Sequence, residues 1–225
     1  FTVVNPAVVD EITDQGVPEE NVRYVENGVD TERFNPEADH GNDRSEYGLP
    51  DDTPLMLSLG RLTGQKRPEL LVDWFAELSE RMEEKTSLAI AGKGPRQESA
   101  SAVAQSRGLH NVHFLGYVPE EDKASLYATA DYFLLPSSYE GSPLALYEAL
   151  ASGTPAIVSD LPGTRFVADA ECGIVTAFHE SREVSRIAEY IAEDDEHPAN
   201  ARRYAVTHLD WAERGAEYRT EFDRI

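Results

Sequence analysis

Short apolar segments alternate along this chain with longer amphipathic segments, and this alternation limits the possible folds more than any other feature. Most of the short segments are apolar at consecutive positions, which is typical of strands buried on both faces of a parallel sheet. The longer segments carry apolar residues at helical spacing, as at Leu71, Trp74, Phe75 and Leu78. The pattern predicts an α/β fold with a doubly wound, Rossmann-like parallel sheet.

The predicted strands are Val22–Glu26, Leu55–Leu59, Ser87–Ala91, Val112–Leu115, Tyr132–Leu135, Ala156–Ser159 and Ile174–Thr176. The predicted helices are Pro6–Gln15, Pro68–Lys85, Gln97–Arg107, Glu120–Ala130, Pro143–Ser152, Arg182–Asp194 and Pro198–Ile225. His40–Asp52 is rich in loop-forming residues. Because the chain begins with Phe1 and not Met, we expect it to be a piece of a longer protein.

The chain is strongly acidic, with 42 Asp and Glu residues against 20 Lys and Arg residues and a net charge of −22. This charge repels nucleic acid phosphates and anionic membranes, so neither is expected as a partner. We interpret it as adaptation to high salt, where ions screen the self-repulsion; a solvated surface without a specific role is the alternative. The single cysteine, Cys172, allows no disulfide within the chain, and no apolar run is long enough to span a membrane.

Two cations follow the strand Leu55–Leu59, in the segment from Gly60 to the helix start at Pro68. Ligands of open parallel sheets bind beyond the carboxyl ends of the strands. Arg61 and Lys66 at such a strand end therefore predict a phosphate or diphosphate site. The alternative is that they are two surface cations in a loop.

Two glutamates lie around the helix that follows the strand Tyr132–Leu135. Glu140 precedes the helix start, where we expect the backbone N–H groups of Gly141 to Leu144 to be available to oxygen atoms of a ligand. Glu148 falls at the edge of the buried helix face, where a carboxylate could accept hydrogen bonds from sugar hydroxyls. Ordinary helix-terminal and boundary glutamates are equally compatible with this spacing. Gly153 is predicted to follow the helix C-terminus.

The remaining strand ends give weaker signals. Gly92-Lys93-Gly94-Pro95 resembles the start of a dinucleotide fingerprint, but Gln97 breaks G-x-G-x-x-G, and a plain turn explains the segment equally well. Tyr117, in Gly116-Tyr117-Val118-Pro119, could pack beside a flat ring, or the segment could be a structural turn. No Asp-x-Asp pair stands at a strand end, so no metal and no cofactor is expected.

Taken in order, these motifs resemble those of family 4 (group 1) retaining glycosyltransferases over nearly the whole chain. Glu140 to Leu144 with Glu148 is similar to the E-x₇-E signature of that family, and Gly60-Arg61-Leu62 with Lys66 is similar to its phosphate motif. The other matching segments are Asn27-Gly28-Val29-Asp30 with Phe34, Gly92 to Pro95, Gly116 to Pro119, and Gly173.

The resemblance implies the C-terminal, donor-binding half of a GT-B fold. Residues 1–26 would end the N-terminal domain, residues 27–197 would bind the nucleotide sugar, and residues 198–225 would cross back to the N-terminal domain. The implied donor is a UDP-, GDP- or ADP-linked sugar, and the acceptor is a sugar or a lipid-linked glycan. The implied location is the cytoplasm, with the full-length protein also placed at the inner membrane face. With half of the cleft missing, the chain alone is expected to be inactive.

The same resemblance implies the role of each site residue. Arg61 and Lys66, beside Gly60, would bind the donor diphosphate, and Glu148 would hold the ribose hydroxyls. Glu140 and the segment Gly141, Ser142, Pro143 and Leu144 would hold the donor sugar, and Lys93, Tyr117 and Val118 would lie near the base. Glu140, Arg61 and Lys66 are the implied catalytic groups, with Glu140 a positioning group rather than a nucleophile.

Three residues depart from the family pattern and leave the identity of the donor sugar open. Arg67 stands where many members have Gly, Ser142 where many have a large residue, and Phe166 near a position where many have Glu. Three other functions remain as alternatives: a non-catalytic nucleotide-sugar-binding module, a GT-B sugar-nucleotide epimerase and, more remotely, a Rossmann dehydrogenase. The acidic composition leads us to expect a halophilic source.

Overall fold

A computed structural model of the chain describes residues 1–4, 6–37, 44–82, 85–179, 181–192 and 196–222. Its main sheet is parallel and consists of β3 (Leu55–Leu59), β4 (Ser87–Ala91), β5 (Val112–Gly116), β6 (Tyr132–Leu135), β7 (Ala156–Ser159) and β8 (Gly173–Thr176). The helices around it are α2 (Pro68–Ser79), α3 (Gln97–Ser106), α4 (Lys123–Ala128), α5 (Leu144–Ala151), α6 (Phe166–Asp169), α7 (Ser181–Ala192) and α8 (His197–Tyr204). Short 3₁₀ turns cover Glu19–Asn21, Arg44–Tyr47 and Glu120–Asp122.

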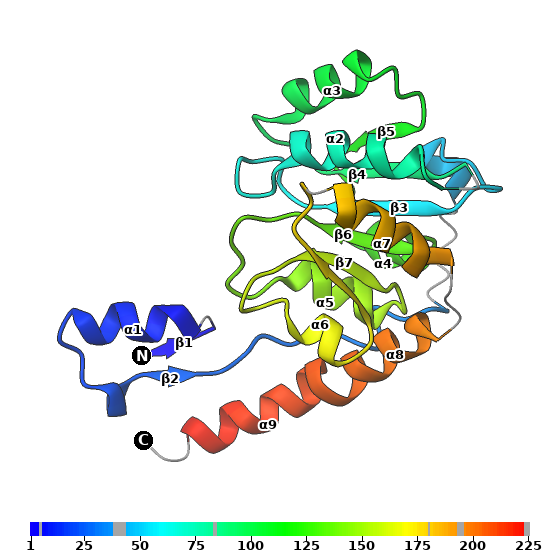
Figure 1. The fold of residues 1–225 in the computed structure, drawn as a ribbon. Helices are drawn as coiled ribbons and strands as arrows, with labels where there is room; N and C mark the ends of the chain where they lie inside the picture. The colour runs from blue at the N-terminus through cyan, green and yellow to red at the C-terminus, as the bar shows by residue number, and fades with distance from the viewer. Residues whose placement is uncertain (5, 38–43, 83–84, 180, 193–195, 223–225) are drawn as a thin grey trace.

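Helices cover both faces of this sheet, as a doubly wound fold requires (Figure 1). On one face α2, α3 and α7 pack on one set of strand residues, among them Leu88, Ile90 and Leu134. On the other face α4, α5 and α8 pack on the alternate set, among them Leu57, Ala89 and Phe133. Because side chains alternate between the faces of a strand, strands covered on both faces are apolar at most positions. The α/β prediction is thereby confirmed.

Most of the predicted element bounds agree with the structure. Four strands, β3, β4, β6 and β7, begin and end at the predicted residues, and β5 and β8 are each one residue longer. Gly153 follows α5 with a positive φ of 76°, and its N–H donates to the Leu150 carbonyl at 3.0 Å, as expected for a glycine at a helix C-terminus. The predicted loop His40–Asp52 falls partly outside the described residues, and its described part includes the turn Arg44–Tyr47.

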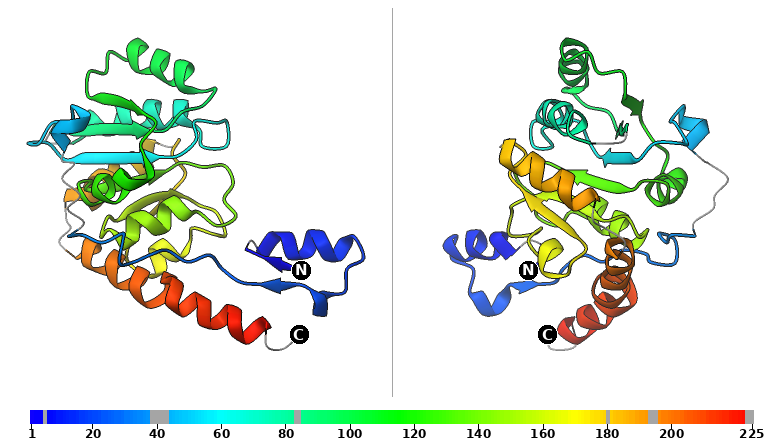
Figure 2. Two further views of the ribbon diagram at one scale, coloured as in Figure 1. Left: turned by 180° about the vertical axis from the view of Figure 1, so that it is seen from behind. Right: turned by 45° about the vertical axis from the view of Figure 1, so that its right-hand side comes forward.

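The first residues form a separate unit. Here β1 (Thr2–Val3) and β2 (Arg23–Tyr24) pair in parallel, with α1 (Pro6–Asp14) between them in the chain. The predicted strand Val22–Glu26 is thus too long, and β1 was missed, since two residues are too few to show a pattern. In Figures 1 and 2 this unit stands apart from the main sheet.

The predicted helix Pro198–Ile225 is wrong as a single element. α8 continues into a π-helical turn at Ala205–Leu209, Asp210 is extended, and α9 (Trp211–Phe222) begins after it. Asp210 pairs with Val29 in an isolated parallel bridge, and its carboxylate accepts from the Ala212 N–H at 2.7 Å, which caps α9. The break therefore arises from a contact with residues far away in the sequence. α9 extends toward the N-terminal unit (Figure 2).

Other predicted helices are shorter. α2 ends at Ser79 and not at Lys85. The segment predicted as the helix Glu120–Ala130 begins with a 3₁₀ turn, and only Lys123–Ala128 is α-helical.

Candidate functional site

The order of the strands locates the site. The sheet runs β5-β4-β3-β6-β7-β8, so the chain winds outward in one direction from β3 and in the other direction from β6. The crevice of such a sheet opens between these two central strands, beyond their carboxyl ends. The segments that leave β3 and β6 are residues 60–67 and 136–143. These two loops contain the predicted phosphate cations and Glu140.

An ion pair joins the two loops. The Nζ of Lys66 lies 2.5 Å from Oε1 of Glu140, and the Glu140 side chain is only 7% exposed. The carbon stem of Lys66 passes over Gly60, where an added Cβ would be 3.6 Å from Cε. An ammonium group has three donors, so two are left after the bond to Glu140. Lys66 can therefore hold Glu140 and present protons to an anion at the same time.

Gln65 ties the same two loops together, and sequence reasoning missed it. Its carbonyl accepts from the Ser138 N–H at 2.9 Å, and its side-chain amide donates to the Tyr139 carbonyl at 2.7 Å. These bonds fix the loop after β6 directly before Glu140. No motif in the sequence indicates this role, because the partners are more than 70 residues away.

Arg61 and Arg67 lie on either side of Lys66 in the first loop. Arg61 is exposed, and its guanidinium has no ion-pair partner among the described residues. Arg67 has φ 51° and ψ 48°, the left-handed conformation at the N-terminus of α2. A side chain there costs about 1 kcal/mol, which explains in physical terms why glycine suits this position.

Glu148, on α5, lies half-buried beside α4, as predicted for a residue at the edge of the buried face. The hydroxyl of Tyr127 donates to its Oε2 at 2.9 Å. Burial raises the pKa of the Glu148 carboxyl, while the nearby Lys123 ammonium and the Tyr127 hydroxyl act to lower it. The raised pKa reflects a carboxylate held partly out of water.

The loop after β4 packs backbone to backbone against the first loop. An added Cβ on Gly92 would lie 1.9 Å from the Gly60 carbonyl oxygen, and one on Gly94 would lie 2.2 Å from that of Leu62. The two glycines are thus needed for close loop packing, which favours the plain-turn interpretation of this segment. The side chain of Lys93, exposed, lies beside Gly116.

The two residues predicted near the base differ in exposure. Tyr117 is 67% exposed, so its ring is available to a ligand. Val118 is 5% exposed and belongs to the core between the sheet and α4, so its side chain is not available.

The backbone donors before α5 are fewer than predicted. Pro143 has no N–H, and the N–H of Leu144 donates to the Ser142 carbonyl at 3.0 Å. Among the described residues, only Gly141 and Ser142 of this segment keep an N–H without a protein acceptor. The prediction for Gly141 to Leu144 was thus wrong in part, because Pro143 has no N–H and the entry turn of α5 uses the N–H of Leu144.

Phe166 is half-buried and stacks on Tyr204, with ring centroids 5.0 Å apart. Near this position many members of the family that the sequence resembles have Glu. Here a packing contact between two aromatic rings takes its place.

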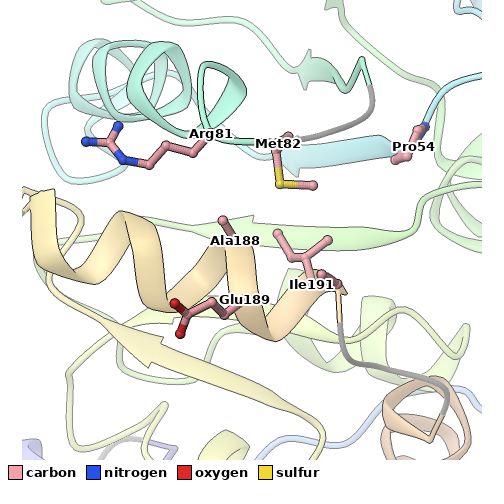
Figure 3. Close-up of a pocket in the computed structure, with 7 residues that line it drawn as sticks. Pro54, Arg81, Met82, Ala188, Glu189 and Ile191 are labelled. Carbon is pink, nitrogen blue, oxygen red and sulfur yellow. The ribbon is translucent and has the colours of Figure 1, made fainter.

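A pocket elsewhere on the molecule does not belong to this site. It lies between the end of α2 and α7 and is lined by Met82, Ala188 and Ile191, with Pro54 at its edge (Figure 3). Pro54 directly precedes β3, so this pocket is at the amino ends of the strands, opposite the loops described above.

The part of the chain that the structure describes contains no cluster of three or more His, Cys, Asp or Glu side chains suited to a metal ion. None of its helices combines the length and apolar character needed to cross a bilayer.

Comparisons with known proteins agree with this geometry. Residues 39–208 match the family described as "Glycosyl transferases group 1". Mannosylfructose-phosphate synthase from Agrobacterium fabrum is 34% identical over 156 residues, 66% of this chain and 34% of that protein. The GDP-mannose-dependent alpha-(1-6)-phosphatidylinositol monomannoside mannosyltransferase of Mycolicibacterium smegmatis is 29% identical over 218 residues, 92% of this chain and 56% of that protein.

Among solved structures, Anabaena HepE in complex with UDP superposes with a TM-score of 0.84 at 19% identity, over all of this chain and 63% of that one. The chain thus spans a third to two thirds of the length of the proteins it resembles. The family match covers most of the chain and includes both loops of the site. From this match, together with the doubly wound sheet, we conclude that the chain belongs to the glycosyl transferases group 1 family.

Proposed function

We propose that this chain is the donor-binding domain of a retaining glycosyltransferase of family 4. The enzyme would transfer a hexosyl group from a nucleoside-diphosphate sugar to an acceptor hydroxyl. The observation that carries the proposal is the Lys66–Glu140 pair across the crevice between β3 and β6. It brings a cation suited to a diphosphate and a carboxylate suited to sugar hydroxyls within one hydrogen bond of each other.

In this proposal the site stabilises the leaving group. When the sugar–phosphate bond breaks, negative charge grows on a phosphate oxygen. Lys66 is a cation held near that place by Glu140, Arg61 follows the same strand, and the N–H groups of Gly141 and Ser142 add donors. Glu140 positions the sugar, and the acceptor attacks from the face that the diphosphate leaves. The departing phosphate takes the acceptor proton. Because the cations and amides stabilise the developing charge, the proposed site needs no metal.

The remaining parts of the donor follow from the positions of the loops. Glu148 accepts hydrogen bonds from the ribose hydroxyls, and Tyr117 packs beside the base. The UDP complex of HepE and the GDP-mannose dependence named for the Mycolicibacterium relative support a nucleoside diphosphate as the ligand. That relative's name also contains a phosphatidylinositol mannoside, which supports a lipid-linked glycan as one acceptor class, reached from the cytoplasm at the inner membrane face.

We also propose that the acceptor half of the cleft belongs to an N-terminal domain outside this sequence. β1, α1 and β2 form a small unit apart from the main sheet, and α9 extends toward it. The contact between Glu26 and Arg214, at 2.9 Å, ties α9 to the chain just after β2. The division into residues 1–26, 27–197 and 198–225 is part of this proposal.

Isothermal titration calorimetry of the chain with UDP, GDP and ADP tests the proposed function. One of them should bind with a Kd below about 1 mM, and no sugar should be transferred from the matching nucleotide sugar, because the acceptor half is missing. Absence of binding for all three would overturn the proposal. Binding of NADH in their place would favour a dehydrogenase. An epimerase would instead convert the nucleotide sugar to a second isomer, which NMR would detect.

The acidic composition supports a further part of the proposal, adaptation to high salt. With a net charge of −22, the folded chain repels itself, and ions screen this repulsion. We expect the melting temperature to rise by about 5 °C or more between 0.1 M and 3 M KCl. A variant in which the exposed Glu19, Glu20, Asp51 and Asp52 become Gln or Asn should gain less from the same salt. Equal melting temperatures of the parent in both salts would contradict the adaptation.

A further inference from the structure

Tyr127 is a buried tyrosine with an immobilised ring. It lies on α4 and is 0% exposed. Its ring contacts Phe34 and Phe133 edge to face, with centroids 6.0 and 5.7 Å away. Its carbonyl accepts from the Thr154 hydroxyl at 2.7 Å. Side chain and backbone are therefore both fixed, and the hydroxyl can point in only one direction.

That direction is toward Glu148. The Tyr127 hydroxyl donates to Oε2 of Glu148, and burial together with the Glu148 charge raises the pKa of Tyr127 well above its usual value. The hydroxyl thus remains protonated and remains the donor. Among the described residues, Oε1 of Glu148 has no hydrogen-bond partner. One oxygen is held by the protein, and the other is left for a ligand.

The other charges around Glu148 do not hold it in this way. Lys123 and Arg33 attract it and Glu120 repels it, but the Lys123 ammonium is 2.6 Å from Glu120, and the Arg33 guanidinium is 3.1 Å from the same carboxylate. Both cations are thus bound elsewhere. Among the described residues, Tyr127 alone donates a hydrogen bond to the Glu148 side chain.

We propose that Tyr127 is a positioning residue that fixes the Glu148 carboxylate for the ribose hydroxyls of the donor nucleotide. The inference rests on the proposed function. Without the hydroxyl, the carboxylate keeps its charge but loses its preferred orientation, so the ligand has to order it on binding. A tyrosine that serves only the core would contribute to folding and not to the recognition of ribose.

The test compares UDP with 2′,3′-dideoxy-UDP, which lacks the ribose hydroxyls, on the parent chain and on Tyr127→Phe. We expect Tyr127→Phe to weaken UDP binding about tenfold and to leave binding of the dideoxy analogue unchanged. If calorimetry identifies GDP or ADP as the ligand, that nucleotide and its dideoxy analogue take their place. Equal losses for both ligands, or no loss for either, would overturn the proposal.

Tyr147→Phe is the matched control. Tyr147 is also buried, at 1% exposure, and its hydroxyl also donates to a glutamate, Glu26, at 2.8 Å. It precedes Glu148 in the chain but does not hold it. Tyr147→Phe should leave the ratio of the affinities for UDP and for the dideoxy analogue unchanged. A change in this ratio as large as that in Tyr127→Phe would count against the proposal.

The pH profile gives a second readout. Protonation makes Glu148 a weaker acceptor, so UDP affinity should fall as the pH drops through the pKa of this residue. The Tyr127 hydroxyl lowers that pKa, so in Tyr127→Phe the fall should begin at a higher pH. Identical profiles would overturn the inference. If the parent chain binds none of the three nucleotides, the proposed function itself fails, and this outcome is distinct from all of the others.

Discussion

Replacing Lys66 by alanine should lower the affinity for UDP by roughly 10- to 100-fold, the worth of one charge-assisted hydrogen bond. The same change should also destabilise the domain, because Lys66 is the partner of a carboxylate that is only 7% exposed. Loss of one partner of a fully buried pair costs about 3 to 5 kcal/mol. The Lys66 side chain is 23% exposed, so in the variant water can reach the Glu140 carboxylate. We therefore expect the free energy of unfolding to fall by about 1 to 2 kcal/mol.

A double-mutant cycle separates the two effects. In the variant with both Lys66→Ala and Glu140→Gln, the buried charge is gone, so stability in urea should return to within about 0.5 kcal/mol of Glu140→Gln alone. UDP affinity should not return, because the cation is still missing. Lys85→Ala, at an exposed lysine away from the site, is the control for loss of a positive charge. UDP binding by Lys66→Ala at the level of the parent would contradict the assignment of the diphosphate site.

Replacing Glu148 by glutamine should have opposite effects on binding and on stability. Binding of UDP should weaken about tenfold or more, because a neutral amide accepts hydrogen bonds from hydroxyls less strongly than a carboxylate does. Stability at neutral pH should rise, because burial raises the pKa of Glu148 in the folded state. A gain of about 1 kcal/mol would raise the melting temperature by about 2 to 4 °C in a domain of this size.

The pH dependence of this gain follows from the direction of the shift. The folded chain binds the Glu148 proton more tightly than the unfolded chain does, so protonation favours folding. The favourable contribution is complete below the unfolded pKa and is lost as the pH rises through the folded pKa. Glu148→Gln should therefore exceed the parent in stability above that pKa, and the difference should shrink in acid. Urea unfolding at pH 5 and pH 8 measures this, and a difference independent of pH would contradict it.

Much of the fold could be predicted because it depends on local pattern. The bounds of four strands were predicted correctly from apolar runs. The position of Gly153 after α5 was predicted from the preference for glycine at helix C-termini. One prediction failed where a distant contact decides the local conformation, since Asp210 breaks the last helical stretch by pairing with Val29. Another failed at a local turn, where the N–H of Leu144 donates to the Ser142 carbonyl. Neither event leaves a trace in the spacing of nearby residues.

The candidate site divides in the same way. Arg61, Lys66, Glu140 and Glu148 could be found in the sequence, because they stand in motifs that follow the predicted strands in the order of a known family. Gln65 and Tyr127 do not stand out. The first acts through its backbone as well as its side chain, and the second is indistinguishable in sequence from any core tyrosine.

By itself the sequence determined the layered α/β architecture, the order of the motifs and hence the family. Each of these depends on residues within one strand, one helix or the turn between them. Only the tertiary structure decided that β3 and β6 are neighbours, that Lys66 reaches Glu140, and that Tyr127 holds Glu148. The physical reason is that strand order and long side-chain contacts are set by packing of the whole domain. A hydrogen bond between residues more than 70 positions apart forms only after that packing is complete.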